Sequence, residues 1–243
     1  DIKIFNCALS ASQIDSIYQA EKSPLDPCLV AKYDFNGNAD DLSGNCNHGT
    51  VNGATLTTDR FGNANSAYSF DGAEEIRVVS STSLESITDS YTISAWVNIS
   101  AFNSTGPGHF PIIDKNDPCL PTSGSTPFLF VGANSSDGYH VQDIDCGVQN
   151  WYGGSGQAPA LSNWDYLVAK YDGVTIDVYV NNVLTSSTAA SGNLSNGVGD
   201  LTIGHTTFGV GDYAFGSIDD IKIYNCALTQ CEISALYHSQ TLT

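Results

Sequence analysis

The sequence predicts an all-β fold in which two antiparallel sheets pack face to face and one short helix closes the chain. From Leu29 onward, short segments rich in valine, isoleucine, tyrosine and threonine alternate with turns of glycine, asparagine and aspartate. Helical periodicity is almost absent before residue 230, and no regular alternation of strands with helices is present. These patterns exclude a parallel α/β sheet.

The clearest strands belong to a predicted antiparallel meander in YDGVTIDVYVNNVL, residues 171–184. Apolar side chains occupy every second position from Val174 to Val180, which is the period of a strand. Asp172-Gly173 and Asn181-Asn182 flank this strand with residues that tolerate the positive φ of tight turns.

The first twenty residues reappear near the other end, as residues 220–239. Each copy reads as a strand followed by a short helix, and a capping box opens each helix. The capping pairs are Ser10 with Gln13 and Thr229 with Glu232.

This long-period repeat predicts tandem domains. We expect residues 1–21 to be the closing strand and helix of a preceding repeat. Residues 22–27 form a linker, because Pro24 and Pro27 prevent a continuous helix. Residues 28–240 form the sandwich domain.

Composition limits the partners of the chain. With 26 acidic and only 8 basic residues the net charge is −18, so no basic face for nucleic acid or anionic lipid is expected. No apolar run reaches the length of a membrane helix, which predicts no membrane insertion. Seven cysteines without zinc-type spacing favour disulfides in an oxidising, extracellular space.

Four segments carry a family resemblance: residues 29–72, YTISAWVNI, NWDYLVAKYDGVTIDVYVNN and the terminal GSIDDIKIYNCALTQCEISALY. Together they resemble the laminin-G-like group of the concanavalin A-like lectin and glucanase jelly rolls, across residues 29–238. The match is weak in the middle, where residues 103–160 look like an insertion with cysteines of its own. The resemblance implies adjacent first and last strands and an extracellular binding or adhesion module, often with calcium.

A calcium site is expected between the loop at 36–45 and the last strand. The loop gathers carboxylate and amide oxygens, which Ca²⁺ prefers, from Asn36, Asn38 and Asp41. By resemblance, Asp41 and Asp219 occupy positions that the family keeps acidic. The alternative is that these residues only form turns.

The resemblance implies that the terminal strands are neighbours, and this predicts a disulfide between Cys28 and Cys226. A second bridge, Cys119 to Cys146, would staple the apparent insertion, which has little core of its own. By the repeat, Cys7 pairs with a preceding unit. Cys231 is a candidate for a bond to another unit or chain, with a buried free thiol as the alternative; the pairing of Cys46 stays open.

No catalytic pattern is recognisable. Jelly-roll glycoside hydrolases commonly carry two carboxylates on one strand face at spacings of two. Asp143 and Asp145 alternate but lack a glutamate, whereas Glu74 and Glu75 are adjacent and face opposite ways. The histidines are scattered without ligand spacing: His48, His109, His140, His205 and His238. We therefore expect a protein that is not an enzyme.

Glycan binding would need exposed aromatic rings beside polar side chains. Trp151 and Tyr152 precede a glycine-rich stretch, which predicts an exposed loop, although Trp151 could instead cover the second disulfide. The favoured function is an extracellular repeat for adhesion or carbohydrate binding, stabilised by Ca²⁺ and disulfides. The alternatives are a filament or sheath subunit that assembles head-to-tail with a neighbouring copy through residues 1–21, and an accessory module of a polysaccharide-degrading enzyme.

Overall fold

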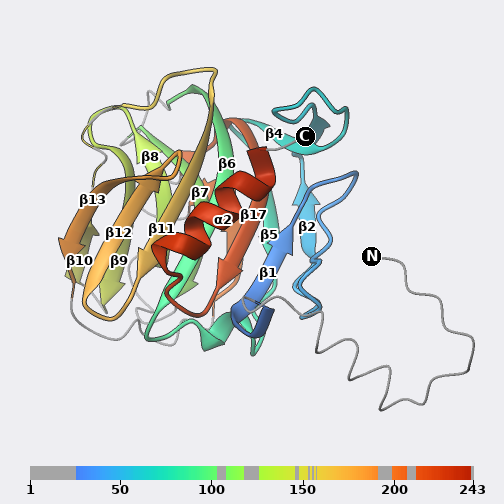
Figure 1. Ribbon diagram of the computed structural model, residues 1–243. Helices are drawn as coiled ribbons and strands as arrows, with labels where there is room; N and C mark the ends of the chain where they lie inside the picture. Colours follow the sequence, from blue (N-terminus) through green and yellow to red (C-terminus); the bar gives the residue numbers. More distant parts are fainter. Residues whose placement is uncertain are drawn as a thin grey trace, which may run out of the picture.

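The computed structural model describes residues 26–102, 108–117, 126–145, 148–152, 158–190, 199–206 and 212–241, together with Gly154 and Gly156. It is a two-sheet antiparallel sandwich with one C-terminal helix, as the sequence predicts (Figure 1). The expected closing element of a preceding repeat, residues 1–21, lies outside the described residues. The expected linker at 22–27 is described only from Asp26, where the 3-10 turn η1 (Asp26–Cys28) begins.

The first sheet, sheet A, has eight strands. Its order is β13 (Val183–Ala189), β12 (Thr175–Val180), β11 (Trp164–Tyr171), β6 (Tyr91–Ala101), β17 (Phe215–Tyr224), β4 (Ala67–Asp71) and β3 (Thr55–Thr57). β1 (Leu29–Tyr33) also pairs with β17. The predicted meander is confirmed, because β11, β12 and β13 pair consecutively and antiparallel.

The second sheet, sheet B, has seven strands. Its order is β10 (Val148–Tyr152), β9 (Gly138–Asp145), β8 (Thr126–Asn134), β7 (His109–Asp117), β14 (Leu201–Ile203), β5 (Glu75–Val78) and β2 (Gly49–Asn52). A small ladder of β15 (His205–Thr206) and β16 (Asp212–Tyr213) lies against β7. The short turn η2 (Leu84–Ser86) precedes β6.

The main core lies between the two sheets, where alternate side chains of a central strand such as β6 point inward: Tyr91, Ile93, Ala95, Val97 and Ile99. Tyr33 and Tyr91 of sheet A, and Phe110 and Ile76 of sheet B, are completely buried there. Burial of such apolar area is the main source of stability for a fold of this kind.

The segment at 103–160 is part of the sandwich. It contains β7 to β10, which are four of the seven strands of sheet B. Phe110, Ile113, Val131 and Val141 from these strands are buried in the main core. The expectation that this segment has little core of its own was therefore wrong.

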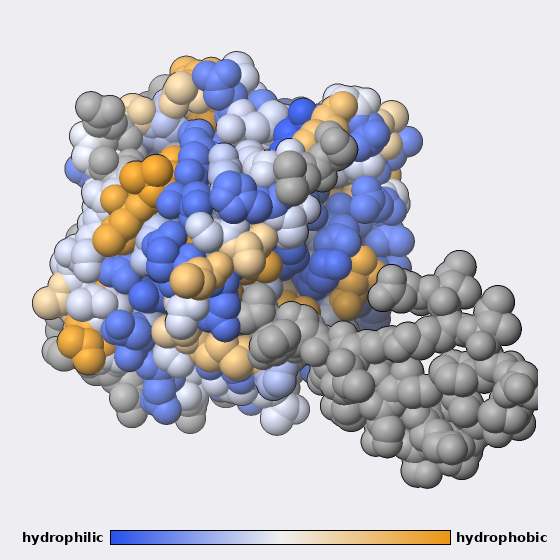
Figure 2. Space-filling view, in the orientation of Figure 1, coloured by the Kyte–Doolittle hydropathy of each residue, from blue (hydrophilic) through white to orange (hydrophobic). Residues whose placement is uncertain are grey.

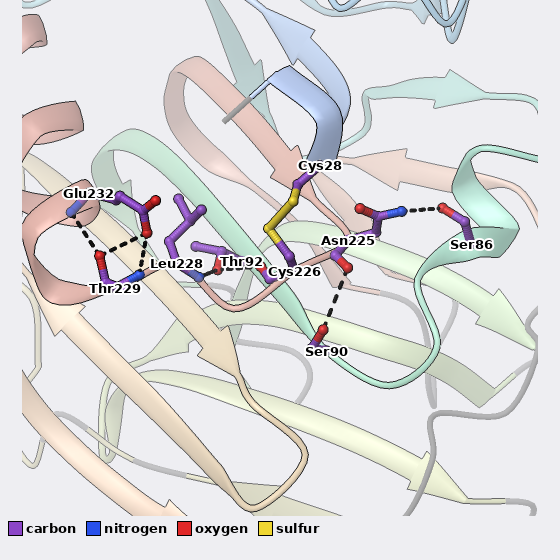
Figure 3. The surroundings of a disulfide bond; sticks show 9 residues. All are labelled: Cys28, Ser86, Ser90, Thr92, Asn225, Cys226, Leu228, Thr229 and Glu232. Carbon is purple, nitrogen blue, oxygen red and sulfur yellow. Dashed lines mark hydrogen bonds between the residues drawn. A yellow bond between two sulfur atoms is a disulfide. The ribbon is translucent and has the colours of Figure 1, made fainter. Parts of the chain in front are cut away.

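The terminal strands of the domain lie side by side, as expected. β1 runs antiparallel to β17, with Leu29 opposite Tyr224 and Tyr33 opposite Ile221. Just beyond these strands the predicted disulfide between Cys28 and Cys226 is present, with Cα atoms 5.8 Å apart (Figure 3). Cys7, Cys119 and Cys146 lie outside the described residues, so their pairing stays a prediction.

Hydrogen bonds fix the chain on both sides of the disulfide (Figure 3). Thr92 Oγ1 donates to the carbonyl of Cys226 at 2.9 Å and accepts from the N–H of Leu228 at 2.9 Å. Asn225 donates through Nδ2 to Ser86 Oγ at 2.9 Å. The last strand is thereby tied to β6 and η2 as well as to β1.

Helix α2 (Gln230–Thr241) packs against the outer face of sheet A (Figure 1). The predicted capping box is confirmed: the Thr229 N–H donates to Glu232 Oε2 at 2.7 Å, and the Glu232 N–H donates to Thr229 Oγ1 at 3.3 Å. Under the helix lies a second core, which we call the outer aromatic cluster. It consists of Trp96, Tyr166, Val168, Tyr179, Tyr224, Leu228, Ile233 and Leu236.

The surface that carries α2 is mostly hydrophilic, with small separate apolar patches (Figure 2). None of the helices in the described part of the chain is long and apolar enough to cross a membrane.

Candidate functional site

The loop at 36–45 is organised by the buried carboxylate of Asp41. Oδ1 accepts the N–H groups of Lys32 at 2.9 Å and Ser43 at 2.8 Å. Oδ2 accepts Ser43 Oγ at 2.8 Å and the Asn47 N–H at 2.9 Å. Four protein donors therefore occupy the four lone-pair positions of this carboxylate. A cation at Asp41 would have to displace some of them.

Asp219, the second predicted acidic ligand, binds a different set of partners. Its Oδ2 accepts from Arg60 Nη1 at 2.9 Å, and its Oδ1 accepts the Asp220 N–H at 2.7 Å. Arg60 also pairs with Asp220 at 2.7 Å and donates to the carbonyl of Gln240, near the end of α2, at 2.9 Å. Its guanidinium lies 4.5 Å from the centre of the Trp96 ring.

These contacts give Asp219 a structural role between α2 and β17. Burial, together with the nearby Asp220 carboxylate, raises the pKa of Asp219 to about 8, although Arg60 opposes both effects. The carboxylate supports the attachment of the helix through Arg60. In this structure Asp219 and Asp41 have no hydrogen-bond partner in common.

The two amides of the predicted calcium set are exposed. Asn38 Oδ1 accepts the Asp40 N–H at 2.9 Å, an interaction typical of a turn. Within the described ranges, no three histidine, cysteine, aspartate or glutamate side chains are grouped so that they could share a metal ion. The calcium site stays a prediction.

Trp151 and Tyr152 lie in the strand β10 and not in a loop, which corrects the sequence expectation. Their side chains lie outside the described part of the structure. By backbone register, Trp151 belongs to a row of cross-strand partners that crosses sheet B from β10 to β5. The row consists of Trp151, Gln142, Phe130, Asp114, Thr202 and Arg77.

Polar side chains gather on the outer face of sheet B, where β15 and β16 lie against β7. His109 of β7 and His140 of β9 are both buried, with ring centres 5.4 Å apart. His109 Nδ1 lies 3.4 Å from Asp212 Oδ2 of β16. His140 Nδ1 lies 3.1 Å from the carbonyl oxygen of Gly138.

Burial governs the protonation of both histidines. It lowers the pKa of His140 to about 4, helped by His109 and opposed by the Gly138 carbonyl and by Asp137. It also lowers the pKa of His109, against the attraction of Asp212 and Asp137. Both imidazoles are therefore neutral near pH 7, and each carries one donor and one acceptor nitrogen.

Beside this buried pair, four side chains come together from four strands, three of them half-buried and Asn52 exposed, and we call this group the Tyr213 site. His205 of β15 stacks on Tyr213 of β16, with ring centres 4.2 Å apart. His205 Nδ1 lies 2.8 Å from Glu75 Oε2 of β5. Glu75 Oε1 accepts from Asn52 Nδ2 of β2 at 3.2 Å. An aromatic ring, an imidazole, a carboxylate and an amide are thereby held in one place.

A glycine permits this arrangement. Gly204 joins β14 to β15 with a φ of +81°, and a Cβ atom there would overlap the ring of Phe70. The chain can therefore turn sharply and bring His205 over β5.

Sequence reasoning missed both groups, because His109, His140 and His205 are far apart in the sequence and follow no ligand spacing. The only sequence signal was weak: each of these histidines falls within or directly beside a segment with strand pattern.

Two cysteines of the described chain are free. Cys46 in the loop before β2 and Cys231 at the start of α2 are both exposed. A role of Cys231 in linking units stays a prediction, and the alternative of a buried thiol was wrong for it.

Residues 70–234 match the family profile described as the concanavalin A-like lectin/glucanases superfamily. No curated protein matches the chain. Among solved structures, domain 4 of AbnA, a GH43 extracellular arabinanase from Geobacillus stearothermophilus in complex with arabinotriose, is similar with a TM-score of 0.67 at 18% identity. That alignment covers 86% of this chain and 98% of the arabinanase domain chain.

Binding domains of botulinum neurotoxins are similar too. The type C toxin, whose cell entry depends on interaction with two ganglioside molecules, has a TM-score of 0.61 at 15% identity over 90% of this chain and 53% of that chain. The binding domain of the DC toxin, in complex with rat synaptotagmin II, has a TM-score of 0.63 at 15% identity over the same shares. This chain thus spans about half the length of the toxin chains. At such identities the likeness shows a shared fold.

Proposed function

Because the chain belongs to the concanavalin A-like lectin/glucanases superfamily, we propose that it is a non-catalytic, extracellular module that binds carbohydrate. The observation that carries the proposal is the Tyr213 site on the outer face of sheet B. There, a stacked tyrosine and histidine stand beside a carboxylate and an amide.

These side chains have the chemistry that sugars require. A sugar ring presents C–H groups that pack on an aromatic face, and hydroxyls that both donate and accept hydrogen bonds. Tyr213 supplies the ring, whereas Glu75 accepts, Asn52 donates and accepts, and His205 contributes an imidazole. Hydrogen bonds between Asn52, Glu75 and His205 fix these groups before a ligand arrives, which reduces the entropic cost of binding.

The charge of the chain points to neutral sugars. A net charge of −18 repels sulfated and other strongly acidic glycans, which basic surfaces bind. The arabinotriose bound to the arabinanase domain and the gangliosides of the type C toxin support a saccharide ligand for this fold. The disulfide between Cys28 and Cys226 supports an oxidising, extracellular setting.

Calcium at the loop of 36–45 remains part of the proposal, as a weak site that uses Asn36, Asn38 and Asp41. Since four donors already occupy Asp41, an ion there would replace hydrogen bonds by coordination bonds. We assign Asp219 to the attachment of α2 instead.

The proposal is tested by calorimetric titration of the full chain with neutral oligosaccharides selected on a glycan array. We expect Tyr213→Ala to weaken binding by about tenfold or more, because a stacking platform is lost. The matched control is Phe61→Ala, which removes an exposed aromatic ring outside the site, next to Arg60; its affinity should stay that of the wild type.

Two outcomes would contradict the proposal at different levels. If the wild-type chain binds no oligosaccharide on the array, carbohydrate binding itself is refuted. If Trp151→Ala abolishes binding while Tyr213→Ala leaves it intact, the proposed function is kept but the binding site is assigned to β10.

A further inference from the structure

Two segments of this chain have the sequence of one and the same structural element. Residues 1–20 and 220–239 are identical at ten of twenty positions. In the structure the second copy supplies the second half of β17, the disulfide partner of Cys28 and most of α2 (Figure 3). The contacts of the second copy therefore define what any occupant of this place must provide.

The apolar contacts of the second copy are matched in the first. In β17, Ile221 and Ile223 are completely buried in the main core. In α2, Ile233 is completely buried in the outer aromatic cluster, and Tyr237 stacks on Trp96 with ring centres 6.0 Å apart. The first copy has the same four residue types at these positions, namely Ile2, Ile4, Ile14 and Tyr18.

The polar contacts beside the disulfide are matched as well. Asn225 donates its N–H to the carbonyl of Cys28 at 2.9 Å, and Asn6 stands at the same position of the first copy. The capping pair of α2 corresponds to Ser10 and Gln13, which can form the same two hydrogen bonds. The first copy can therefore satisfy the same backbone groups.

The contacts with Asn182 favour the second copy. Asn182 Nδ2 donates to Ser234 Oγ at 2.7 Å, and Gln230 Nε2 donates to Asn182 Oδ1 at 3.2 Å. The first copy has Asp15 and Ala11 at these positions. Asp15 can accept the first hydrogen bond, but Ala11 cannot make the second.

The second copy begins at an irregularity of β17. Asp220 has a φ of +49°, and the pairing of β17 with β6 shifts between Asp219 and Lys222. The preceding residues 215–218 pair with both β4 and β6. Residues 220–239 can therefore leave the sheet without breaking these pairs.

The linker is long enough to let the first copy take this place. The end of α2 lies beside Asp220, because Arg60 binds both. Asp220 is four strand positions, about 13 Å, from the end of β17, which pairs with the start of β1. The seven residues 21–27 can span about 24 Å, and Pro24 and Pro27 favour an extended course.

We propose that residues 1–20 are a second occupant of the place that residues 220–239 fill in this structure, and that thiol–disulfide exchange selects between the two. The Cys7 thiolate attacks the sulfur of Cys28. The Cys7–Cys28 bond forms, the Cys28–Cys226 bond breaks, and Cys226 leaves as a thiolate. The exchange needs no net oxidation.

Loop closure and native contacts act in opposite directions on this choice. Cys28 is 21 residues from Cys7 and 198 residues from Cys226, so an unfolded chain brings the nearer pair together about 30-fold more often. The contacts with Asn182 then favour the pairing seen here. This inference differs from a preceding repeat and from head-to-tail assembly, because both occupants belong to one chain.

Disulfide mapping of the full chain tests the proposal. The protein is equilibrated in a glutathione redox buffer, its free thiols are blocked, and the ratio of Cys7–Cys28 to Cys28–Cys226 is measured by mass spectrometry. Ile233→Asp should raise this ratio by about tenfold or more, because it buries a charge in the outer aromatic cluster. The matched control is the equivalent substitution in the first copy, Ile14→Asp, which should lower the ratio.

Thermal unfolding separates docking of the first copy from mere proximity of Cys7 and Cys28. Ile233→Asp should keep a cooperative transition, since residues 1–20 can close the domain, whereas the double variant Ile14→Asp, Ile233→Asp should lose it. An unchanged disulfide ratio in Ile233→Asp would overturn the proposal. So would an Ile233→Asp protein that unfolds like the double variant, or a Cys7 that bonds only to another chain.

Discussion

The two sheets share one core, but their outer faces differ. The outer face of sheet A carries the outer aromatic cluster and is covered by α2. The outer face of sheet B carries His109, His140 and the Tyr213 site, and β15 and β16 lie over part of it. An apolar outer face must be covered to remove it from water, whereas a polar outer face can be left available for a ligand. The helix thus covers the apolar outer face of sheet A, and under the proposed function recognition takes place at sheet B.

The difference is visible within single strands. In β12, Ile176 and Val178 point into the main core, while Tyr179 belongs to the outer aromatic cluster. In β5, Ile76 is buried in the main core, while Glu75 and Arg77 lie on the other side and are more accessible. Disruption of each face should therefore affect different properties.

The largest expected effect is the loss of stability when the disulfide that joins the terminal strands of sheet A is removed. The disulfide between Cys28 and Cys226 encloses a sequence separation of 198 residues, and long loops lose most entropy when crosslinked. We expect the double variant Cys28→Ala, Cys226→Ala to lose about 4 kcal/mol of unfolding free energy. Urea denaturation would measure it, with the Cys46→Ala variant as a control that should be neutral.

The next largest effect is the loss of stability when the packing of α2 against sheet A is weakened. Ile233 of α2 is completely buried in the outer aromatic cluster, so Ile233→Ala leaves a cavity and should cost about 3 kcal/mol. His238→Ala, at an exposed position of the same helix, should change the stability little. Oligosaccharide binding at sheet B should survive in both variants. Loss of binding in Ile233→Ala at a temperature where it remains folded would refute the separation of the two faces.

A smaller effect depends on pH and belongs to sheet B. The folded state keeps His140 neutral down to pH about 4, whereas the unfolded chain protonates it near its ordinary value of about 6.5. The unfolded state therefore binds more protons between these values. This contribution to stability is complete above pH 6.5 and is lost as the pH falls toward 4, with about 2 kcal/mol of the loss between pH 7 and pH 5.

His140→Asn keeps a side-chain donor for the Gly138 carbonyl but does not titrate. The difference in unfolding free energy between wild type and variant should therefore change between pH 7 and pH 5. A constant difference across this range would show that His140 does not cause the change in unfolding free energy with pH.

The smallest effect concerns calcium at the loop of 36–45. A millimolar site adds only about 1 kcal/mol at a tenfold excess of ion over its dissociation constant, and this raises the melting temperature by about 3 °C. We expect this rise when Ca²⁺ is added to chelated protein, and its loss in Asn36→Ala, which removes an exposed candidate ligand. An unchanged melting temperature of the wild type would end the calcium proposal.

The sequence predicted those parts of the fold that depend on local patterns. Thr229 and Glu232 cap α2 because their spacing fits one turn, and strict alternation identified β12 between two turns. The family resemblance implied that the terminal strands are neighbours, and the disulfide between Cys28 and Cys226 was predicted from that.

Other parts depend on long-range pairing, which no local pattern encodes. β7 to β10 are separated by segments rich in serine, glycine and proline, so they resembled an insertion rather than half a sheet. The glycines after Tyr152 suggested a loop, but pairing with β9 draws Trp151 and Tyr152 into a strand. The histidines of sheet B become neighbours only because β7 and β9 both pair with β8 and β15 lies against β7.

The bond between Cys28 and Cys226 has a mechanical consequence for a chain pulled from both ends. Tension entering before Cys28 passes directly through the sulfur atoms to the residues after Cys226. The residues enclosed between them carry none of the load, so both sheets stay folded under traction. Of the described residues outside this closed loop, those of α2 form the one regular element that tension could extend.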